Sequence, residues 1–287
     1  MAFRDKLEQG EFIITSEIAP PKGTEVNRLL EEIEVLKDRV DAINVTDLQS
    51  SVMRLGSLGM CIVLKQRGFE PIFQLTCRDR NRLALQSDLL TASLFGIENI
   101  LALTGDHPHL GDHPHAKPVF DLDSVHLLEV INILNEGKDM MGNFLEGKPN
   151  FLPGAVVNPG ADPLEPEIIK MEKKIKAGAQ FFQTQAVFDI DSFVSFIRKV
   201  EPFKIPILAG IVLLKSAKMA RYMNDNVAGV KIPEKIIKRI ESTQDKVSTS
   251  IEITVEIIRE IKPMCQGIHI MPIGWNKIVP KILDYLG

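Results

Sequence analysis

Eight short apolar runs, each followed by a segment with helical periodicity, constrain the fold of this chain most strongly. Near-continuous apolar runs are typical of parallel strands that are buried on both faces. Parallel strands also need a crossover connection, which is usually a helix. The alternation therefore predicts a parallel sheet covered by helices, with strands at residues 12–18, 40–46, 71–76, 99–104, 151–158, 180–185, 206–212 and 267–271.

The segments between these runs have the spacing of amphipathic helices, and glycine follows two of them, at Gly96 and Gly178. Eight strand–helix units in 287 residues match a (β/α)8 TIM barrel. A doubly wound open sheet is the alternative, but no G-x-G-x-x-G motif follows the first strand. We therefore expect one barrel domain over residues 1–287, with helices at 25–37, 53–66, 80–95, 123–135, 166–177, 190–200, 216–223, 234–261 and 276–286.

Charge and hydropathy exclude several classes of protein. The net charge of −4 and the isoelectric point of about 5.9 argue against nucleic acid or an anionic membrane surface as the main partner. No apolar stretch approaches the roughly 20 residues of a membrane helix. The first eight residues are charged throughout and lack the apolar core of a signal peptide. We expect a cytoplasmic protein.

The three cysteines, Cys61, Cys77 and Cys265, are odd in number and far apart. None forms a C-x-x-C pair, so the sequence supports neither a disulfide framework nor a zinc ribbon. Three thiolates are also too few for an iron–sulfur cluster held by four cysteines. We expect free thiols that are buried or half-buried.

Polar side chains follow several of the expected strands at the end where a barrel carries its chemistry. The fourth run ends in Leu-Thr-Gly-Asp at residues 103–106, which places an aspartate after a turn glycine. Glu17 ends the first strand, and as a carboxylate at a barrel mouth it is a candidate general acid. A solvated loop residue or a lysine partner is the alternative for Glu17. Further polar groups at strand ends are Thr46, Gln74, Thr76, Thr104, Asn158, Thr184 and Gln185.

The loop after the fourth strand contains a near-repeat, Gly-Asp-His-Pro-His, at residues 105–109 and again at 111–115. Its four histidines and two aspartates could bind a transition metal, as in a metal-dependent barrel hydrolase. The alternating prolines, however, predict an extended, open segment, and no ligand pair has i, i+4 spacing. We expect a flexible loop over the barrel mouth and no metal site.

Three lysines, Lys170, Lys173 and Lys174, lie in the expected helix 166–177. Residues three and four apart share a helix face, so Lys170 can neighbour both of the others. One interpretation is a cationic patch for a phosphate or pyrophosphate. The other is an ordinary solvated face whose lysines pair with Glu167 and Glu172.

These strand ends resemble those of the methylenetetrahydrofolate reductase family over nearly the whole chain. The markers are SEIAPP at 16–21, NVTD at 44–47, LTCRD at 75–79, LTGD at 103–106, AGA at 177–179, TQ at 184–185 and FD at 188–189. Their order and spacing carry the resemblance. It implies a flavin-dependent TIM barrel that interconverts 5,10-methylenetetrahydrofolate and 5-methyltetrahydrofolate, with hydride carried by the flavin N5.

The resemblance also implies roles for individual residues. Glu17 matches the acid that protonates N10 of the folate, and Gln185 matches a glutamine that contacts the pterin. Asp106 matches the aspartate between the flavin pyrimidine edge and the pterin. The cofactor is FAD, with FMN as the alternative. Positions that match flavin contacts are Thr46, Gln74, Thr104, Gly105, Asp106, Ala155, Asn158, Glu167, Lys170, Lys173 and Lys174.

Four departures from the NADH-using bacterial enzymes concern the electron donor. Gln74 stands where those enzymes have histidine, Thr104 replaces an arginine, Asn158 replaces an aromatic residue, and Ala217 replaces the phenylalanine that stacks on nicotinamide. The eighth strand reads Ile-His-Ile-Met-Pro at 268–272 in place of His-Phe-Tyr-Thr-Leu-Asn. The pattern is similar to reductases of acetogens and other anaerobes. It implies an iron–sulfur partner subunit as electron donor. For the assembly we expect a homo-oligomer or a hetero-complex.

Overall fold

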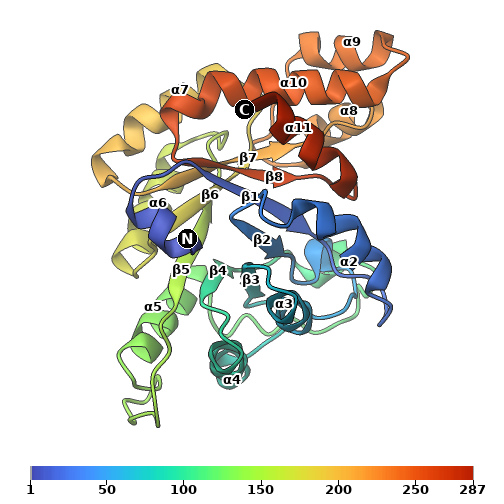
Figure 1. Cartoon of the computed structure of the whole chain (residues 1–287). Helices are drawn as coiled ribbons and strands as arrows, with labels where there is room; N and C mark the ends of the chain where they lie inside the picture. The colour runs from blue at the N-terminus through green and yellow to red at the C-terminus, as the bar shows by residue number, and fades with distance from the viewer. Residues whose placement is uncertain (1, 287) are drawn as a thin grey trace.

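The computed structural model describes residues 2–286 and forms a closed barrel of eight parallel strands (Figure 1). Each strand pairs with the next, and β8 pairs with β1, where Thr15 lies opposite His269. This confirms the predicted (β/α)8 barrel. The strands are β1 (Ile13–Ile18), β2 (Ala42–Val45), β3 (Pro71–Thr76), β4 (Asn99–Leu103), β5 (Leu152–Val157), β6 (Phe181–Ala186), β7 (Ile207–Val212) and β8 (Gly267–Met271).

Helices connect the strands and cover the outside of the barrel (Figure 1). They are α1 (Phe3–Glu8), α2 (Asn27–Ile33), α3 (Ser57–Gln66), α4 (Arg82–Leu94), α5 (Ser124–Asn135), α6 (Glu165–Lys176), α7 (Ile190–Val200), α8 (Ala217–Asn226), α9 (Glu234–Ser242), α10 (Lys246–Ile261) and α11 (Val279–Leu286). Short 3-10 helices are η1 (Glu34–Leu36), η2 (Gln49–Ser51), η3 (Pro108–Leu110), η4 (Glu201–Phe203), η5 (Lys262–Met264) and η6 (Asn276–Ile278). Within residues 2–286, no helix combines the length and apolar character that a membrane crossing requires.

The N-terminal helix α1 was not predicted, because only two of its residues, Phe3 and Leu7, are large and apolar and most of the others are charged. Phe3 and Leu7, one helical turn apart, are buried in the barrel interior. The ring of Phe3 meets Phe181 of β6 edge to face, with centroids 5.5 Å apart. The helix therefore covers the N-terminal end of the barrel.

The prediction of one long helix over residues 234–261 was wrong. The structure divides this stretch into α9 and α10, because Thr243 adopts an extended conformation. Asp245 then caps α10, and its carboxylate accepts a hydrogen bond from the backbone N–H of Ser248 at 3.0 Å. An aspartate that caps a new helix is a local signal for such a break.

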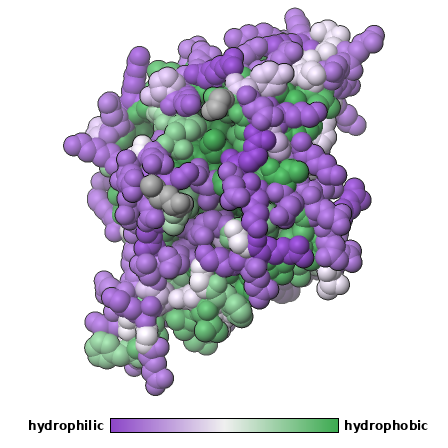
Figure 2. Space-filling model, viewed as in Figure 1, coloured by the Kyte–Doolittle hydropathy of each residue, from purple (hydrophilic) through white to green (hydrophobic). Residues whose placement is uncertain are grey.

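Large apolar side chains are exposed on α4 and on the arm that follows α5, residues 136–147. The most exposed of them are Leu83 at 74%, Leu94 at 80%, Met141 at 83% and Phe144 at 84%. The backbone N–H of Met140 donates to the side chain of Gln86 at 2.9 Å, which holds the arm beside α4. Figure 2 shows this apolar surface along the lower edge of the molecule. Exposed apolar patches of this kind mark interaction sites.

Candidate functional site

A cavity of about 240 Å³ lies inside the barrel near the carboxyl ends of the strands. Five of the predicted site residues line it: Glu17, Gln74, Asn158, Glu167 and Gln185. Its other lining residues are Leu101, Leu103, Val156, Val157, Gln183, Thr184, His269 and Met271. Ligand pockets begin at roughly 300 Å³, so a fused-ring ligand would fill this cavity and extend over the strand ends.

Glu17 is the centre of a small polar network in this cavity. Its side chain is 12% exposed, and its Oε2 accepts a hydrogen bond from Gln74 Nε2 at 3.0 Å. The same oxygen lies 3.5 Å from Nε2 of His269 on β8. The predicted acid therefore faces a ligand cavity with an amide and an imidazole beside it. Sequence reasoning missed His269, which was considered only as part of an unusual eighth strand.

A pair of buried amides forms the next layer of the barrel interior. Asn44 on β2 donates to Gln183 Oε1 at 2.8 Å, and Gln183 donates in return to Asn44 Oδ1 at 3.0 Å. Each amide thus gives the other a hydrogen-bond donor and an acceptor, as buried polar groups require. They were also missed, although polar residues at inward positions of otherwise apolar strands are a usable signal.

Glu167 and Asn158 form one side of the cavity rim. The backbone N–H of Asn158 donates to Glu167 Oε1 at 3.0 Å, and the Asn158 side chain donates to the carbonyl of Ala228 at 3.0 Å. The side chain of Gln185 accepts from the backbone N–H of Ala186 at 3.1 Å. These residues thus have structural contacts, and the amide N–H groups of Gln185 are left for a ligand.

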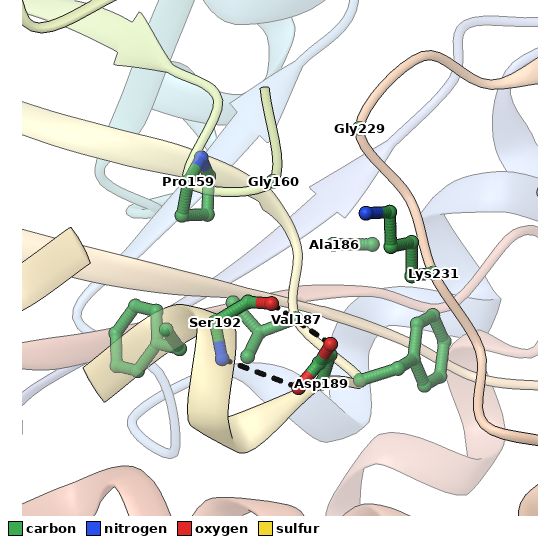
Figure 3. A pocket seen from close by; sticks show the side chains of 10 residues that line it. Pro159, Gly160, Ala186, Val187, Asp189, Ser192, Gly229 and Lys231 are labelled. Carbon is green, nitrogen blue, oxygen red and sulfur yellow. Dashed lines mark hydrogen bonds between the residues drawn. The ribbon is translucent and has the colours of Figure 1, made fainter. Parts of the chain in front are cut away.

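A second pocket beside this rim is too small for a substrate. It measures about 20 Å³, which is room for about one water molecule (Figure 3). A Cβ on Gly160 would lie 1.9 Å from the carbonyl oxygen of Gly229, so the two loops meet in backbone contact. Asp189 caps α7 through Ser192, at 3.2 Å to its N–H and 2.8 Å to its hydroxyl. The Phe-Asp marker at 188–189 is therefore a helix start.

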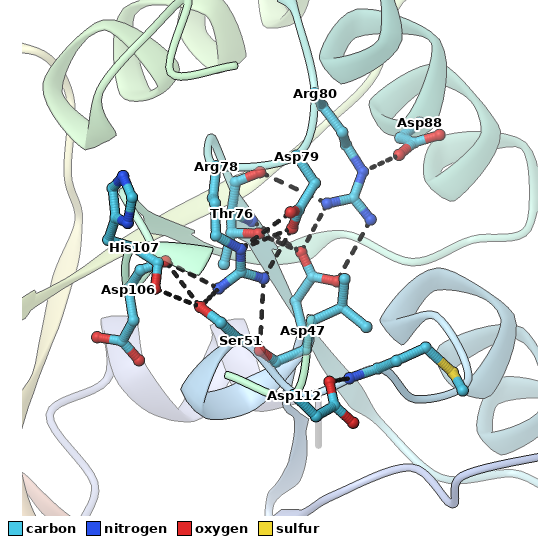
Figure 4. Close-up of polar contacts among 12 residues, drawn as sticks. Asp47, Ser51, Thr76, Arg78, Asp79, Arg80, Asp88, Asp106, His107 and Asp112 are labelled. Atoms are coloured by element: carbon cyan, nitrogen blue, oxygen red, sulfur yellow. Dashed lines mark hydrogen bonds and ion pairs between the residues drawn. The ribbon is translucent and has the colours of Figure 1, made fainter. Parts of the chain in front are cut away.

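Asp106 is exposed and does not line the cavity. Its backbone carbonyl accepts hydrogen bonds from Ser51 Oγ at 2.9 Å and from Arg78 Nη1 at 3.3 Å, while its carboxylate points away from Arg78 (Figure 4). Gly105 precedes it with φ of +90°, and a Cβ there would lie 3.1 Å from that of Arg78. Thr104 accepts from the first N–H of α5, on Ser124, at 3.2 Å. The loop backbone is therefore fixed and the carboxylate is free to meet a ligand.

The markers at 44–47 and 75–79 meet in one ion-pair network (Figure 4). The fully buried carboxylate of Asp47 accepts from the backbone and hydroxyl of Thr76, at 3.0 and 2.8 Å, and from Arg80 at 2.7 Å. Arg80 also binds Asp88 at 2.8 Å. Beside this network Thr46 is buried and its Oγ1 has no hydrogen-bond partner. Ala155 is fully buried in the apolar layer between strands and helices.

The three lysines of α6 do not form one exposed patch. Lys170 and Lys173 are exposed, whereas Lys174 is 2% exposed and donates to the carbonyl of Val156 on β5 at 2.6 Å. Burial, together with the neighbouring charge of Lys170, lowers the pKa of Lys174 to about 8. The solvated-face interpretation is therefore wrong for Lys174.

Because of this lowered pKa, we expect the free energy of unfolding to rise between about pH 8 and pH 10.5. In that range the unfolded chain still binds the proton that the folded chain has released, so higher pH favours folding. The gain is on the order of 3 kcal/mol, since one pKa unit is worth about 1.4 kcal/mol. Urea unfolding at several pH values should show this rise, and Lys174→Met should remove it. Equal slopes in Lys174→Met and the exposed control Lys173→Met would contradict the assignment.

The loop that was expected to be open and flexible, residues 105–115, is anchored at two points. The carboxylate of Asp112 accepts from Lys22 at 2.6 Å and from the backbone N–H of Met53 at 2.9 Å. His107 stacks on Phe120, with centroids 6.3 Å apart. Between residues 2 and 286, no three His, Cys, Asp or Glu side chains are grouped to hold a metal ion. Contacts to distant residues, which a local pattern does not reveal, hold this loop in place.

All three cysteines are free, with Cys61 and Cys77 buried and Cys265 half-buried. Burial raises the pKa of the Cys77 thiol to about 12 and that of Cys265 to about 11. Thiols held in this way are poor nucleophiles. The structure agrees with the expected packing role.

Comparison with known sequences gives a consistent set of relatives. The family model described as "Methylenetetrahydrofolate reductase" matches residues 2–287. Methylenetetrahydrofolate reductase 2 of Schizosaccharomyces pombe is 26% identical over 99% of this chain and 46% of that protein. The 5,10-methylenetetrahydrofolate reductase of Salmonella typhimurium is 25% identical over 78% of this chain and 72% of that protein. The chain spans less than half the length of the eukaryotic relatives.

Solved structures share the fold. An uncharacterized protein from Clostridium thermocellum, which binds two copies of 5-methyl-5,6,7,8-tetrahydrofolic acid, gives a TM-score of 0.64 at 16% identity. The match covers 98% of this chain and 96% of that one. An F420-dependent secondary alcohol dehydrogenase gives 0.56 at 12% identity, over 96% and 99% of the two chains. At these identities the likeness concerns the fold alone.

Proposed function

Because this chain belongs to the methylenetetrahydrofolate reductase family, we propose that it reduces 5,10-methylenetetrahydrofolate to 5-methyltetrahydrofolate with a bound flavin. The observation that supports this most is Glu17, a partly buried carboxylate in a cavity at the closed barrel's carboxyl end. A partly buried carboxyl group in such a cavity suits a reaction that needs one proton at a ring nitrogen.

In this proposal Glu17 gives its proton to N10 of the folate, so that the C–N10 bond breaks and leaves an iminium at N5. Gln74 then holds the resulting carboxylate through its hydrogen bond to Oε2. Gln185 presents its amide N–H groups to the pterin. The apolar wall, which includes Leu101 and Val156, keeps water from the iminium carbon.

The residues beside the cavity fit a flavin. Thr46 Oγ1 at the end of β2 is buried without a hydrogen-bond partner, so it is available to a polar atom of the flavin. Lys170 and Lys173 are exposed cations on α6 that suit the cofactor phosphates. A bound flavin would supply the hydride. Gln74, Thr104, Asn158 and Glu167 complete the proposed flavin-binding set. Two other positions of the resemblance, Ala155 and Lys174, are left out of it, because Ala155 is buried between β5 and the helices and Lys174 is bound to the carbonyl of Val156.

Asp106 is proposed to contact both flavin and folate through its free carboxylate. Asp106→Asn should weaken folate binding about tenfold and shift the flavin potential, because a charge facing the ligands is lost while the loop is still held through its carbonyl. A folate titration and a potentiometric titration of the purified variant measure both effects. A variant unchanged in both would show that Asp106 acts only in the loop.

The absorbance spectrum of the purified protein tests the cofactor proposal. We expect the two visible bands of oxidised flavin, and mass spectrometry of the released cofactor should identify FAD. Release of FMN would change the cofactor but keep the reaction class. A colourless protein with stoichiometric zinc would overturn the proposal in favour of a hydrolase that uses the histidines at 107–115.

A second candidate function is that of a folate-reducing subunit that receives electrons from an iron–sulfur partner. The exposed apolar side chains on α4 and the arm favour this, because they offer a docking area in which large apolar groups are accessible. We expect the isolated chain to lack NADH- and NADPH-driven turnover, and a Leu94→Glu, Phe144→Glu variant to keep its flavin but lose the partner. Robust NADH-driven turnover by the isolated chain would exclude this candidate.

A further inference from the structure

We propose that Arg78 is a positioning residue that fixes the place of the Asp106 carboxylate by joining the loops after β2, β3 and β4. This inference rests on the proposed function, in which Asp106 contacts the ligands. It gives a role to the buried cation of the marker at 75–79, and it follows from the directions in which the five N–H groups of its guanidinium donate.

The charge of Arg78 is balanced within its own loop. The side chain is 2% exposed, and its guanidinium donates to the carboxylate of Asp79 from Nε at 2.9 Å and from Nη2 at 2.7 Å. This bidentate pair neutralises a cation that is removed from water. The carboxylate of Asp106 points away from Arg78 (Figure 4), so its own charge is left for a ligand.

The other N–H groups of Arg78 bind the two neighbouring loops. Nη2 donates to the carbonyl of Leu48 after β2 at 3.4 Å, and Nη1 donates to the carbonyl of Asp106 after β4 at 3.3 Å. Nη1 also donates to the Ser51 hydroxyl at 3.0 Å, and this hydroxyl donates in turn to the Asp106 carbonyl at 2.9 Å. The Asp106 carbonyl is therefore held by Arg78 directly and through Ser51.

The loop after β2 makes these contacts in a strained conformation. Leu48, Ser50 and Ser51 have φ values of 48°, 55° and 56°, in a region that residues with a side chain rarely adopt. Such strain persists only where the surrounding contacts determine it, and it is concentrated at functional sites. A Cβ on Gly111 would lie 1.8 Å from the Ser51 carbonyl oxygen, so the loops after β2 and β4 also meet in backbone contact. The contacts of Arg78 thus stabilise a strained turn against the loop that carries Asp106.

The place of the Asp106 carboxylate depends on its backbone, because the side chain points away from the network that holds the carbonyl (Figure 4). A small displacement of a charged group from its productive position costs affinity or rate. Loss of the Arg78 contacts should therefore weaken ligand binding through Asp106, and only while Asp106 carries its charge.

A double-mutant cycle on folate binding tests this proposal. Arg78→Met keeps an aliphatic stem but removes every N–H donor. We expect the Kd for 5-methyltetrahydrofolate, measured from the change in flavin absorbance, to rise about fivefold. In the Asp106→Asn background the same change should alter Kd by at most about twofold, because the charge that Arg78 positions is already gone. Ser51→Ala should give a smaller rise with the same dependence on Asp106.

The matched control is Arg82→Met, which removes an exposed bidentate pair with Asp121 and should leave Kd at the wild-type value. Far-UV circular dichroism verifies the fold of each variant. If Arg78→Met does not fold, the cycle of Ser51→Ala with Asp106→Asn decides the question.

An equal rise of Kd in both backgrounds, or no rise in a folded variant, would overturn the proposal and leave Arg78 with a structural role only. Failure of the proposed function gives a different result. Asp106→Asn alone would then leave folate binding unchanged, or the wild-type chain would bind no folate, and the positioning role would be excluded with it.

Discussion

Glu17→Gln is expected to retain the flavin and to lose folate turnover by a factor of about 10²–10⁴, the usual contribution of a positioned acid. The amide has nearly the same shape as the carboxyl group but cannot give a proton to N10. The contact with Gln74 can persist after rotation of the new amide, so folate binding should change much less than turnover. Single-turnover oxidation of the reduced protein by methylenetetrahydrofolate measures the effect directly.

A matched control is Glu11→Gln, which changes an exposed glutamate just before the same strand. Its rate should equal that of the wild-type chain. If Glu17→Gln keeps its rate within about threefold, against the usual 10²-fold or larger loss, Glu17 is not the acid. Loss of flavin in Glu17→Gln would instead indicate a structural role for the cavity network.

Arg80→Ala is expected to reduce the free energy of unfolding by about 3–5 kcal/mol, because it leaves the buried carboxylate of Asp47 without its cation. Two hydrogen bonds from Thr76 remain, but they do not neutralise the charge. Urea unfolding at neutral pH measures the change. The control Arg82→Ala removes an exposed pair with Asp121 and should alter stability little.

A double-mutant cycle separates this ion pair from general effects of truncation. Asp47→Asn in the Arg80→Ala background should restore part of the lost stability, because no unpaired charge is then buried. A single Arg80→Ala variant as stable as Arg82→Ala would contradict the account. Additive effects of Arg80→Ala and Asp47→Asn on the free energy of unfolding would also contradict it.

The barrel could be predicted because its signal repeats eight times, and the predicted ends of most strands agree with the structure within two residues. The remaining differences have tertiary causes. The helix that contains Phe3 and Leu7 could not be predicted, because these two side chains form an apolar contact only with the interior of the folded barrel. The histidine loop is fixed by Lys22 and by the backbone of Met53, which are distant in sequence.

The cavity lining could be predicted where a polar side chain stands at the end of an apolar strand, as at Glu17, Gln74 and Gln185. His269 could not, because it meets Glu17 only when β8 pairs with β1 and closes the barrel. The burial of Lys174 could not be predicted for a related reason. Its side chain reaches from α6 to a carbonyl of β5, whereas helical spacing describes only neighbours on the same helix.

Anaerobic mixing of the reduced protein with 5,10-methylenetetrahydrofolate tests the central claim most directly. Chemical reduction of the bound flavin beforehand makes the result independent of the natural electron donor. We predict that the absorbance of oxidised flavin returns and that one 5-methyltetrahydrofolate forms per flavin. A protein that stays reduced in the presence of saturating folate, or that yields no methyl product, would contradict the account.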